Sequence, residues 1–289
     1  MRIARYAHGN AASHHLGIVQ GQTIRPVGPP EARLSDLLHD PDVRDQIEEW
    51  LGRADPGDDI PLDSVRLLSP VDRQEVWGAG VTYERSKQAR QDESEQGGSF
   101  YDLVYRAPRP ELFFKATPSR VVGPGEPVRV RQDTRWCVPE PELTLVLSPT
   151  FRIVGFTIGN DVSARDIEGE NPLYLPQAKV YDACCALGPV ITLAHAMPPI
   201  AEVEIRLEVI RDGRTIVRES TPLARMARTF EELVGWLARD NRIPDGAFLL
   251  TGTGIVPPDD FSLAQGDLVR IEIDGIGTLV NPVVQGPLA

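Results

Sequence analysis

Hydrophobic and polar residues alternate along much of the chain after residue 70, which is the pattern of β-strands with one buried face. The alternation is strictest in Glu142–Leu147 and Val203–Ile210, where every second side chain is predicted to point to a buried face. Two predicted strands are followed by an Asp-Gly pair, which is typical of a tight hairpin turn. We therefore predict two hairpins, one joining Val203–Ile210 to Thr215–Glu219 through Arg211–Arg214, and one joining Leu268–Ile273 to Gly277–Val280 through Asp274-Gly275.

Helical periodicity is confined to a few segments. Near the N-terminus, predicted strands at Arg2–Tyr6 and Leu16–Val19 precede a predicted helix from Ser35 to Leu51, with Ser35 and Asp36 as its capping residues. Further helices are predicted at Tyr83–Glu95 and Thr229–Asp240. Because strands and helices do not alternate regularly, a Rossmann-type sheet is not expected. The pattern predicts an α+β fold, mainly β, with a small N-terminal α/β unit.

The chain is predicted to divide into two domains. The stretch Asp55–Pro61 is rich in Asp, Pro and Gly and is the best candidate for a boundary between compact units. We expect a small N-terminal domain over residues 1–70 and a larger, strand-rich domain over residues 71–289.

Composition argues against several functional classes. The 289 residues include 30 Lys and Arg against 42 Asp and Glu, a formal net charge of −12, so neither nucleic-acid binding nor docking on an anionic membrane is expected. No apolar run is long enough to span a membrane, and the N-terminal residues lack the apolar run of a signal peptide. Three cysteines, Cys137, Cys184 and Cys185, leave one unpaired in any disulfide scheme, which indicates a reducing cytoplasm.

Motifs for nucleotides, zinc and histidine catalysis are incomplete. Gly78-Ala-Gly80 and Gly252-Thr-Gly254 lack the third glycine of a dinucleotide-binding fingerprint, and the chain has no phosphate-binding P-loop motif. The cysteines lack the C-x-x-C spacing of a zinc ribbon. His195 stands alone beyond the N-terminal unit, and a loop histidine is the simpler interpretation of it.

Three carboxylates form the strongest chemical pattern. Glu140 and Glu142 are two residues apart at the start of a predicted strand, so their side chains point to the same face. Asp161 follows the apolar run Ile153–Ile158 and can approach them from a neighbouring strand. Converging carboxylates repel one another unless a cation binds, and an all-oxygen set favours Mg²⁺, then Mn²⁺ or Ca²⁺. The alternative is that both glutamates are solvated on an exposed strand.

Six motifs in order resemble the fumarylacetoacetate hydrolase superfamily over about residues 70–285. The motifs are Trp77–Tyr83 (WGAGVTY), Pro110–Lys115 (PELFFK), Glu140–Leu143 (EPEL), Gly159–Asp166 (GNDVSARD), Lys179 and Thr251–Gly254 (TGTG). The resemblance implies a β-rich catalytic domain in which Glu140, Glu142 and Asp161 hold a divalent metal. It also implies that Lys179 faces the substrate and that Thr253 is the threonine of the family's G-T-G turn.

One departure from the superfamily pattern narrows the expected reaction. Hydrolases and decarboxylases of the superfamily usually carry N-Y-x-x-H, whose histidine acts on water, but Ser86 stands at that position. Val81–Ser86 and Ile167–Tyr181 instead resemble the branch that dehydrates 2-keto-3-deoxy pentonates. The implied mechanism is chelation of a small 2-keto sugar acid by Mg²⁺, loss of a C3 proton, and departure of the C4 hydroxyl as water, giving 2,5-dioxopentanoate.

Proton transfer in this mechanism needs an acid and a base near the metal. Glu111, just before the apolar residues 112–114, is our first choice for activating a water or carrying a proton. Lys179 is expected to act either as the base or as electrostatic support for the enolate. Arg85, Ser86 and Thr253 are candidates to hold the substrate carboxylate.

Other residues are expected to line or support the site. Lys115 is assigned to substrate binding or to support of the metal carboxylates. Arg165 either lines the site or pairs with Asp166 or Glu168. The segment Tyr83–Tyr101 is either a lid over the site or an ordinary surface helix.

Two further functional classes remain open. The chain could catalyse another reaction of the superfamily, such as acylpyruvate hydrolysis, oxaloacetate decarboxylation or enol isomerisation. It could also be a non-catalytic sugar-acid-binding protein that has lost its chemistry. In either case the resemblance implies a homo-oligomer.

Overall fold

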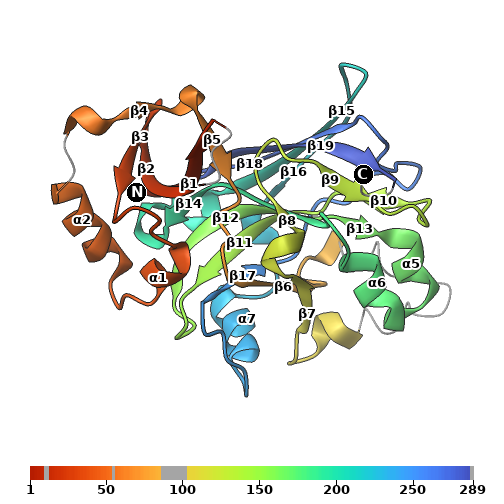
Figure 1. Cartoon of the computed structure of the whole chain (residues 1–289). Coiled ribbons are helices and arrows are strands. Elements are labelled where there is room, and N and C mark those ends of the chain that lie inside the picture. The colour runs from red at the N-terminus through yellow and green to blue at the C-terminus, as the bar shows by residue number, and fades with distance from the viewer. Residues whose placement is uncertain (10–12, 54–55, 86–102, 287–289) are drawn as a thin grey trace.

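β-Strands dominate the computed structural model, which describes residues 1–9, 13–53, 56–85 and 103–286 (Figure 1). The strands of the longest sheet are β1 (Arg2–His8), β2 (His15–Gln20), β3 (Thr23–Val27), β4 (Ile60–Pro61), β5 (Val65–Leu68), β6 (Glu75–Gly80), β7 (Glu111–Ala116), β8 (Val121–Val122), β11 (Pro141–Leu147), β12 (Ile153–Asp161), β14 (Cys185–Leu193) and β17 (Ala247–Leu250). They run in the order β4-β3-β2-β1-β14-β12-β11-β17-β6-β7, with β5 beside β1 and β8 beside β14. The mainly β fold that the sequence predicts is confirmed.

A second sheet packs across the centre of the first. Its strands are β9 (Val128–Val130), β15 (Glu204–Arg211), β16 (Arg214–Pro222), β18 (Leu268–Ile273) and β19 (Gly277–Gln285), in the order β16-β15-β18-β19-β9. β15, β18 and β19 contact β11, β12 and β14 respectively. Leu143 and Leu145 of β11 and Leu207 and Val209 of β15 belong to the core between the sheets. A third, short pairing joins β10 (Cys137–Val138) to β13 (Ser163–Ala164).

The opposite face of the long sheet is covered by two N-terminal helices, α1 (Leu34–Leu38) and α2 (Val43–Arg53) (Figure 1). Leu37 and Ile47 of these helices share a core with Val146 of β11 and Phe248 of β17. Every residue of β11 is therefore buried. The prediction that Glu142–Leu147 has a single buried face is wrong, because a hydrophobic layer covers each side of this central strand.

The predicted helix from Ser35 to Leu51 is two helices. The break comes at Pro41, which has no backbone N–H and whose ring disfavours a continuous helix. The predicted capping role of Ser35 and Asp36 is also wrong. The N-terminus of α1 is held by Asp72, whose carboxylate accepts hydrogen bonds from the backbone N–H groups of Leu34 at 2.6 Å and Ser35 at 3.3 Å.

The N-terminal unit joins the long sheet directly. β1 pairs with β14 through Arg2 and Ile3, and β5 returns to pair with the other end of β1. β4, which ends at Pro61, pairs with β3 of this unit, and the boundary expected at residues 55–61 stays a prediction. Division into domains at residue 70 stays a prediction.

Both predicted hairpins are confirmed. Asp212 and Gly213 have φ values of 50° and 74°, the left-handed conformations that a tight two-residue turn between β15 and β16 requires. β18 and β19 pair across the turn after Ile273.

The remaining helices are short. The helix predicted at Thr229–Asp240 is present as α7 (Phe230–Leu237). Thr229 caps it by accepting a hydrogen bond from the Glu232 N–H. The others are α5 (Arg165–Glu170), α6 (Leu175–Lys179) and the 3-10 helices η1 (Pro56–Asp58), η2 (Leu62–Ser64), η3 (Pro118–Arg120), η4 (Pro172–Tyr174), η5 (Ala194–Ala196), η6 (Ile200–Glu202) and η7 (Leu223–Arg225). The helix predicted at Tyr83–Glu95 lies largely outside the described residues. Within the described ranges, none of the helices has the length and apolar character needed to cross a membrane.

Candidate active site

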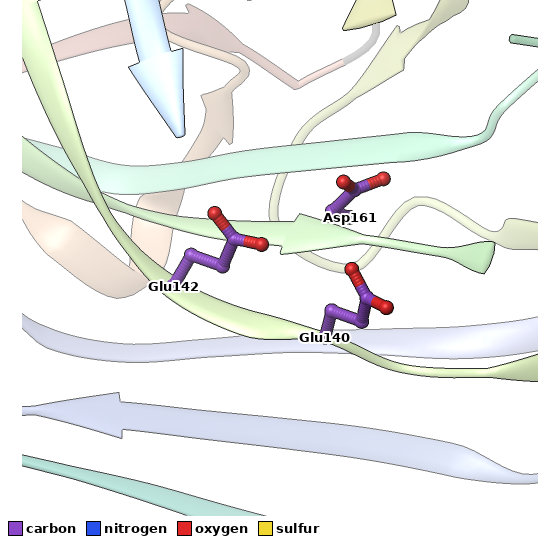
Figure 2. A group of neighbouring side chains, drawn as sticks. All are labelled: Glu140, Glu142 and Asp161. Atoms are coloured by element: carbon purple, nitrogen blue, oxygen red, sulfur yellow. The ribbon is translucent and has the colours of Figure 1, made fainter. Parts of the chain in front are cut away.

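The three predicted metal-ligating carboxylates meet where β11 begins and β12 ends (Figure 2). The two strands are antiparallel, with Glu142 opposite Gly159, and the Asp161 N–H donates to the Glu140 carbonyl at 3.0 Å. This register places Asp161 across from Glu140 on the same face of the sheet. One carboxylate oxygen from each of the three residues lies within 4.8 Å of the others, and all three side chains are buried. We call these three residues the carboxylate triad.

Two basic side chains reach the triad from the helical segment after β12. The Lys179 ammonium, at the end of α6, lies 2.6 Å from Glu140 Oε2 and 3.1 Å from Asp161 Oδ2. The Arg165 guanidinium, at the start of α5, donates to Glu140 Oε1 at 2.9 Å. Arg165 therefore pairs with Glu140, a partner that neither of the two expectations for it named.

Lys115 supports the triad from β7. Its ammonium contacts Asp161 and donates to the carbonyls of Val162 at 3.1 Å and Lys179 at 2.6 Å. Burial lowers the pKa of Lys115, but the attraction of Asp161 together with that of Cys184 and Cys185 outweighs this effect, and the pKa is raised. The side chain is fully buried, so these contacts agree with support of the carboxylates.

Glu142 is held differently from the other two carboxylates. It accepts a hydrogen bond from the Gly252 N–H at 2.6 Å, and within the described ranges no ion pair to Glu142 is found. Burial and the neighbouring Asp161 and Glu140 charges raise its pKa well above the usual value. Gly252 has φ of +90°, and a Cβ there would lie 2.0 Å from Thr82 Oγ1. The close approach of this backbone to Glu142 therefore requires glycine.

The triad fits a hard divalent cation. Its donors are all carboxylate oxygens that converge in a buried place, and burial together with the neighbouring Asp161 and Glu140 charges raises the pKa of Glu142. A bound cation removes the repulsion among the three carboxylates.

A small cavity opens at the triad. It has room of about 20 Å³ for the centre of a water-sized sphere, enough for one ion or water molecule. Besides the triad, its wall includes Glu111, Phe113, Glu168, Lys179 and Thr253. Glu111 lies opposite Gly80 of β6, where a Cβ would come within 2.1 Å of Glu111 Oε2. Gly80 therefore leaves the space that Glu111 occupies.

The other predicted substrate-binding residues have different positions. Arg85 lies outside this cavity, half exposed, and its guanidinium donates to Glu219 at 3.2 Å and to the Val256 carbonyl at 3.0 Å. Ser86 lies outside the described residues, as does most of the segment Tyr83–Tyr101. Its first residue, Tyr83, forms an isolated bridge with Met226.

Glu168 is a charged residue of the cavity wall that the sequence analysis did not assign to the site. It is 4% exposed and lies on the same helix as Arg165. The sequence signal for Glu168 was its spacing of three residues from Arg165. In a helix that begins at Arg165, this spacing places Glu168 on the same face as Arg165.

Comparisons with known proteins agree with this geometry. The family model described as fumarylacetoacetate (FAA) hydrolase C-terminal matches residues 75–284, and the model described as Rv2993c-like, N-terminal matches residues 1–70. A Haloferax volcanii protein named probable 2-keto-3-deoxyxylonate dehydratase is 51% identical over 80% of this chain and 78% of its own length. The 2-dehydro-3-deoxy-D-arabinonate dehydratase of Saccharolobus solfataricus is 47% identical over 77% of this chain and 76% of its own.

Comparison with solved structures agrees with the family match. The structure described as 2-keto-3-deoxy-D-arabinonate dehydratase complexed with magnesium and 2,5-dioxopentanoate has a TM-score of 0.82 and 37% identity, and the comparison covers 100% of both chains. A family model matches most of the chain, and relatives share about half of its residues over the aligned length. The chain therefore belongs to the fumarylacetoacetate hydrolase family.

Proposed function

We propose that the protein is a Mg²⁺-dependent dehydratase that converts a 2-keto-3-deoxy pentonate to 2,5-dioxopentanoate. The observation that carries this proposal is the buried carboxylate triad with Lys179 against it, in a chain 51% and 47% identical to proteins named as dehydratases of such acids. The similar structure described with magnesium and 2,5-dioxopentanoate supports both the ion and the product.

The two names of the relatives are compatible with one substrate. Conversion of a pentonate to its 2-keto-3-deoxy form removes the stereocentres at C2 and C3 and leaves C4. D-Arabinonate and D-xylonate have the same configuration at C4, so both yield the same 2-keto-3-deoxy acid. We therefore propose the D-pentonate derivative as the substrate.

Carboxylates dominate the cavity, and a set of carboxylate oxygens supports a divalent ion. Five carboxylates belong to the triad or to the cavity wall, namely Glu111, Glu140, Glu142, Asp161 and Glu168. In the described part of the chain, three basic side chains contact the triad: Lys115, Arg165 and Lys179. When bound by the triad, Mg²⁺ would polarise the C2 ketone and so favour loss of the C3 proton.

We assign the remaining chemistry to Glu111 and Lys179. Lys179 forms ion pairs with Glu140 and Asp161, so we assign it to electrostatic support of the enolate. Glu111 is then the base that removes the C3 proton. The electron pair of the C3–H bond is held in the enolate and then forms the C3–C4 double bond as the C4–O bond breaks, and Glu111 returns the proton that it took from C3 to the departing hydroxyl, which leaves as water. Transfer of hydrogen from C5 and its hydroxyl to C3 and C4 then yields the aldehyde.

The test combines product analysis with one variant. Incubation of the protein with Mg²⁺ and 2-keto-3-deoxy-D-pentonate should yield a semialdehyde that an aldehyde dehydrogenase oxidises, which is followed as NADH formation. Glu142→Gln should abolish both turnover and Mg²⁺ binding by calorimetry, whereas Glu170→Gln, at an exposed position, should preserve both. Turnover of acylpyruvates but not of the pentonate, or turnover that survives Glu142→Gln, would refute the proposal.

Three broader expectations accompany this function. We infer a homo-oligomer, supported by the 83% exposure of the apolar Leu173, and light scattering measures it directly. A cytoplasmic location is supported by three buried free thiols, at Cys137, Cys184 and Cys185. Division into an N-terminal and a catalytic domain is supported by the two family models, which match residues 1–70 and 75–284.

A further inference from the structure

A carboxylate outside the triad forms part of the cavity wall. Glu168 is 4% exposed and comes from α5, which begins four residues after Asp161. Arg165 and Glu168 are the buried charged residues of this helix, one turn apart. Because Arg165 donates a hydrogen bond to Glu140, the face of α5 that carries Arg165 and Glu168 is turned toward the triad. Glu168 on this face forms part of the cavity wall.

The chemistry of the substrate decides which of its groups can face Glu168. Under the proposed function, the C1 carboxylate and the C2 ketone of the substrate lie at the triad and its cation. An anionic wall repels the C1 carboxylate, whereas an ionised carboxylate accepts hydrogen bonds from hydroxyl groups. Glu168 therefore suits the end of the substrate that carries the C4 and C5 hydroxyls.

The two hydroxyls make opposite demands. The C4 hydroxyl leaves as water and must receive a proton, so a hydrogen-bond acceptor at that position would oppose its departure. The C5 hydroxyl stays on its carbon during the elimination, so a hydrogen-bond acceptor at that position stabilises the bound substrate without opposing the reaction. We propose that Glu168 accepts a hydrogen bond from the C5 hydroxyl, and that it selects 2-keto acids with a hydroxymethyl group beyond C4. This inference rests on the proposed function.

A pair of substrates isolates the C5 hydroxyl. 2-Keto-3-deoxy-D-pentonate and 4-hydroxy-2-oxopentanoate of the same C4 configuration differ only in that group, and both can lose water from C3 and C4. Dehydrogenase coupling follows the first product, and ultraviolet absorbance of the conjugated 2-oxo-3-enoate follows the second. The wild-type protein should prefer the pentonate by roughly 10- to 100-fold in kcat/KM, as one hydrogen bond to a charged acceptor provides.

Variants of two neighbouring glutamates supply the test and its control. Glu168→Ala should bring the preference close to one, chiefly by raising KM for the pentonate. Glu168→Gln replaces the charged acceptor by a neutral one of the same shape, so the preference should fall by about 3- to 10-fold. Glu170→Ala, on the same helix but exposed, should keep the wild-type preference. Mg²⁺ binding by calorimetry should be the same in all variants that fold.

The outcomes separate this inference from the proposed function. If the wild-type protein dehydrates the pentonate but Glu168→Ala slows both substrates equally, Glu168 does not recognise the C5 hydroxyl and the inference is wrong. If Glu168→Ala does not fold, an unchanged preference in Glu168→Gln overturns it instead. Failure of the wild-type protein to dehydrate the pentonate refutes the proposed function itself.

Discussion

Replacement of Lys115 by methionine tests whether its ammonium group holds the triad together. Methionine keeps most of the apolar side chain and removes the charge. In the structure the ammonium contacts Asp161 and donates to the Val162 and Lys179 carbonyls at 3.1 and 2.6 Å. The variant therefore leaves a buried carboxylate and two buried carbonyls without this partner.

The expected loss of stability follows from these contacts. Removal of one side of a buried ion pair costs about 3–5 kcal/mol. Lys179 remains 3.1 Å from Asp161 and compensates in part, so we expect the lower end, about 3 kcal/mol, for the metal-free protein. At about 2 °C per kcal/mol for a chain of this size, Tm should fall by about 6 °C.

Urea unfolding followed by tryptophan fluorescence, in EDTA and in saturating Mg²⁺, measures this loss. Removal of a positive charge beside the triad reduces the repulsion of Mg²⁺, so the loss should be smaller with Mg²⁺ present. Arg211→Met is the matched control, because Arg211 pairs at 2.7 Å with Asp267, which is fully buried and outside the cavity wall. Its loss should be the same in both conditions. A loss for Lys115→Met below about 1 kcal/mol in EDTA, or one that Mg²⁺ does not change, would refute this reasoning.

Three smaller perturbations test other parts of the structure. Gly80→Ala should lower kcat by at least about 10-fold with little change in Tm, because its Cβ displaces the flexible end of Glu111 rather than backbone. Asp72→Ala should cost about 1 kcal/mol in urea unfolding, since it removes the acceptor at the N-terminus of α1. The Arg206 hydrogen bond lowers the pKa of Asp274, so its stabilisation is present above the ordinary value of 3.8 and is lost as pH falls below it. Asp274→Asn should therefore destabilise the protein at pH 7, by less than about 1 kcal/mol for this partly exposed pair, and its difference from the wild-type protein should shrink as the pH falls below 3.8.

The metal-ligating set could be predicted because it depends on local rules. Glu140 and Glu142 share a face since side chains alternate along a strand, and Asp161 joins them because β11 and β12 are antiparallel neighbours in sequence. The same local rules also located both hairpins. The helix error at Ser35–Leu51 was avoidable too, since Pro41 interrupts the pattern within the sequence itself.

Residues whose positions depend on distant parts of the chain were not predictable in this way. Arg85 lies outside the cavity wall and contacts Glu219 and Val256, which come from segments 134 and 171 residues further along the chain. Burial on both faces of β11 likewise requires α1 and α2, which the alternation within the strand cannot reveal. The sequence pattern predicts that the strand forms, whereas the hydrophobic layers that cover its two faces come from tertiary packing.

Lysine usage gives one sequence signal for the site that pattern analysis did not exploit. Of the 30 basic residues, 27 are arginine and 3 are lysine, and two of these lysines, Lys115 and Lys179, contact the triad. The third, Lys87, lies outside the described residues. A chain that uses arginine almost everywhere has a physical reason to keep lysine here. The compact ammonium of Lys115 fits between a carboxylate and two carbonyls with no exposed surface, where a planar guanidinium would overpack the site. Lysine at these two positions therefore reflects the space available at the triad rather than a simple need for positive charge.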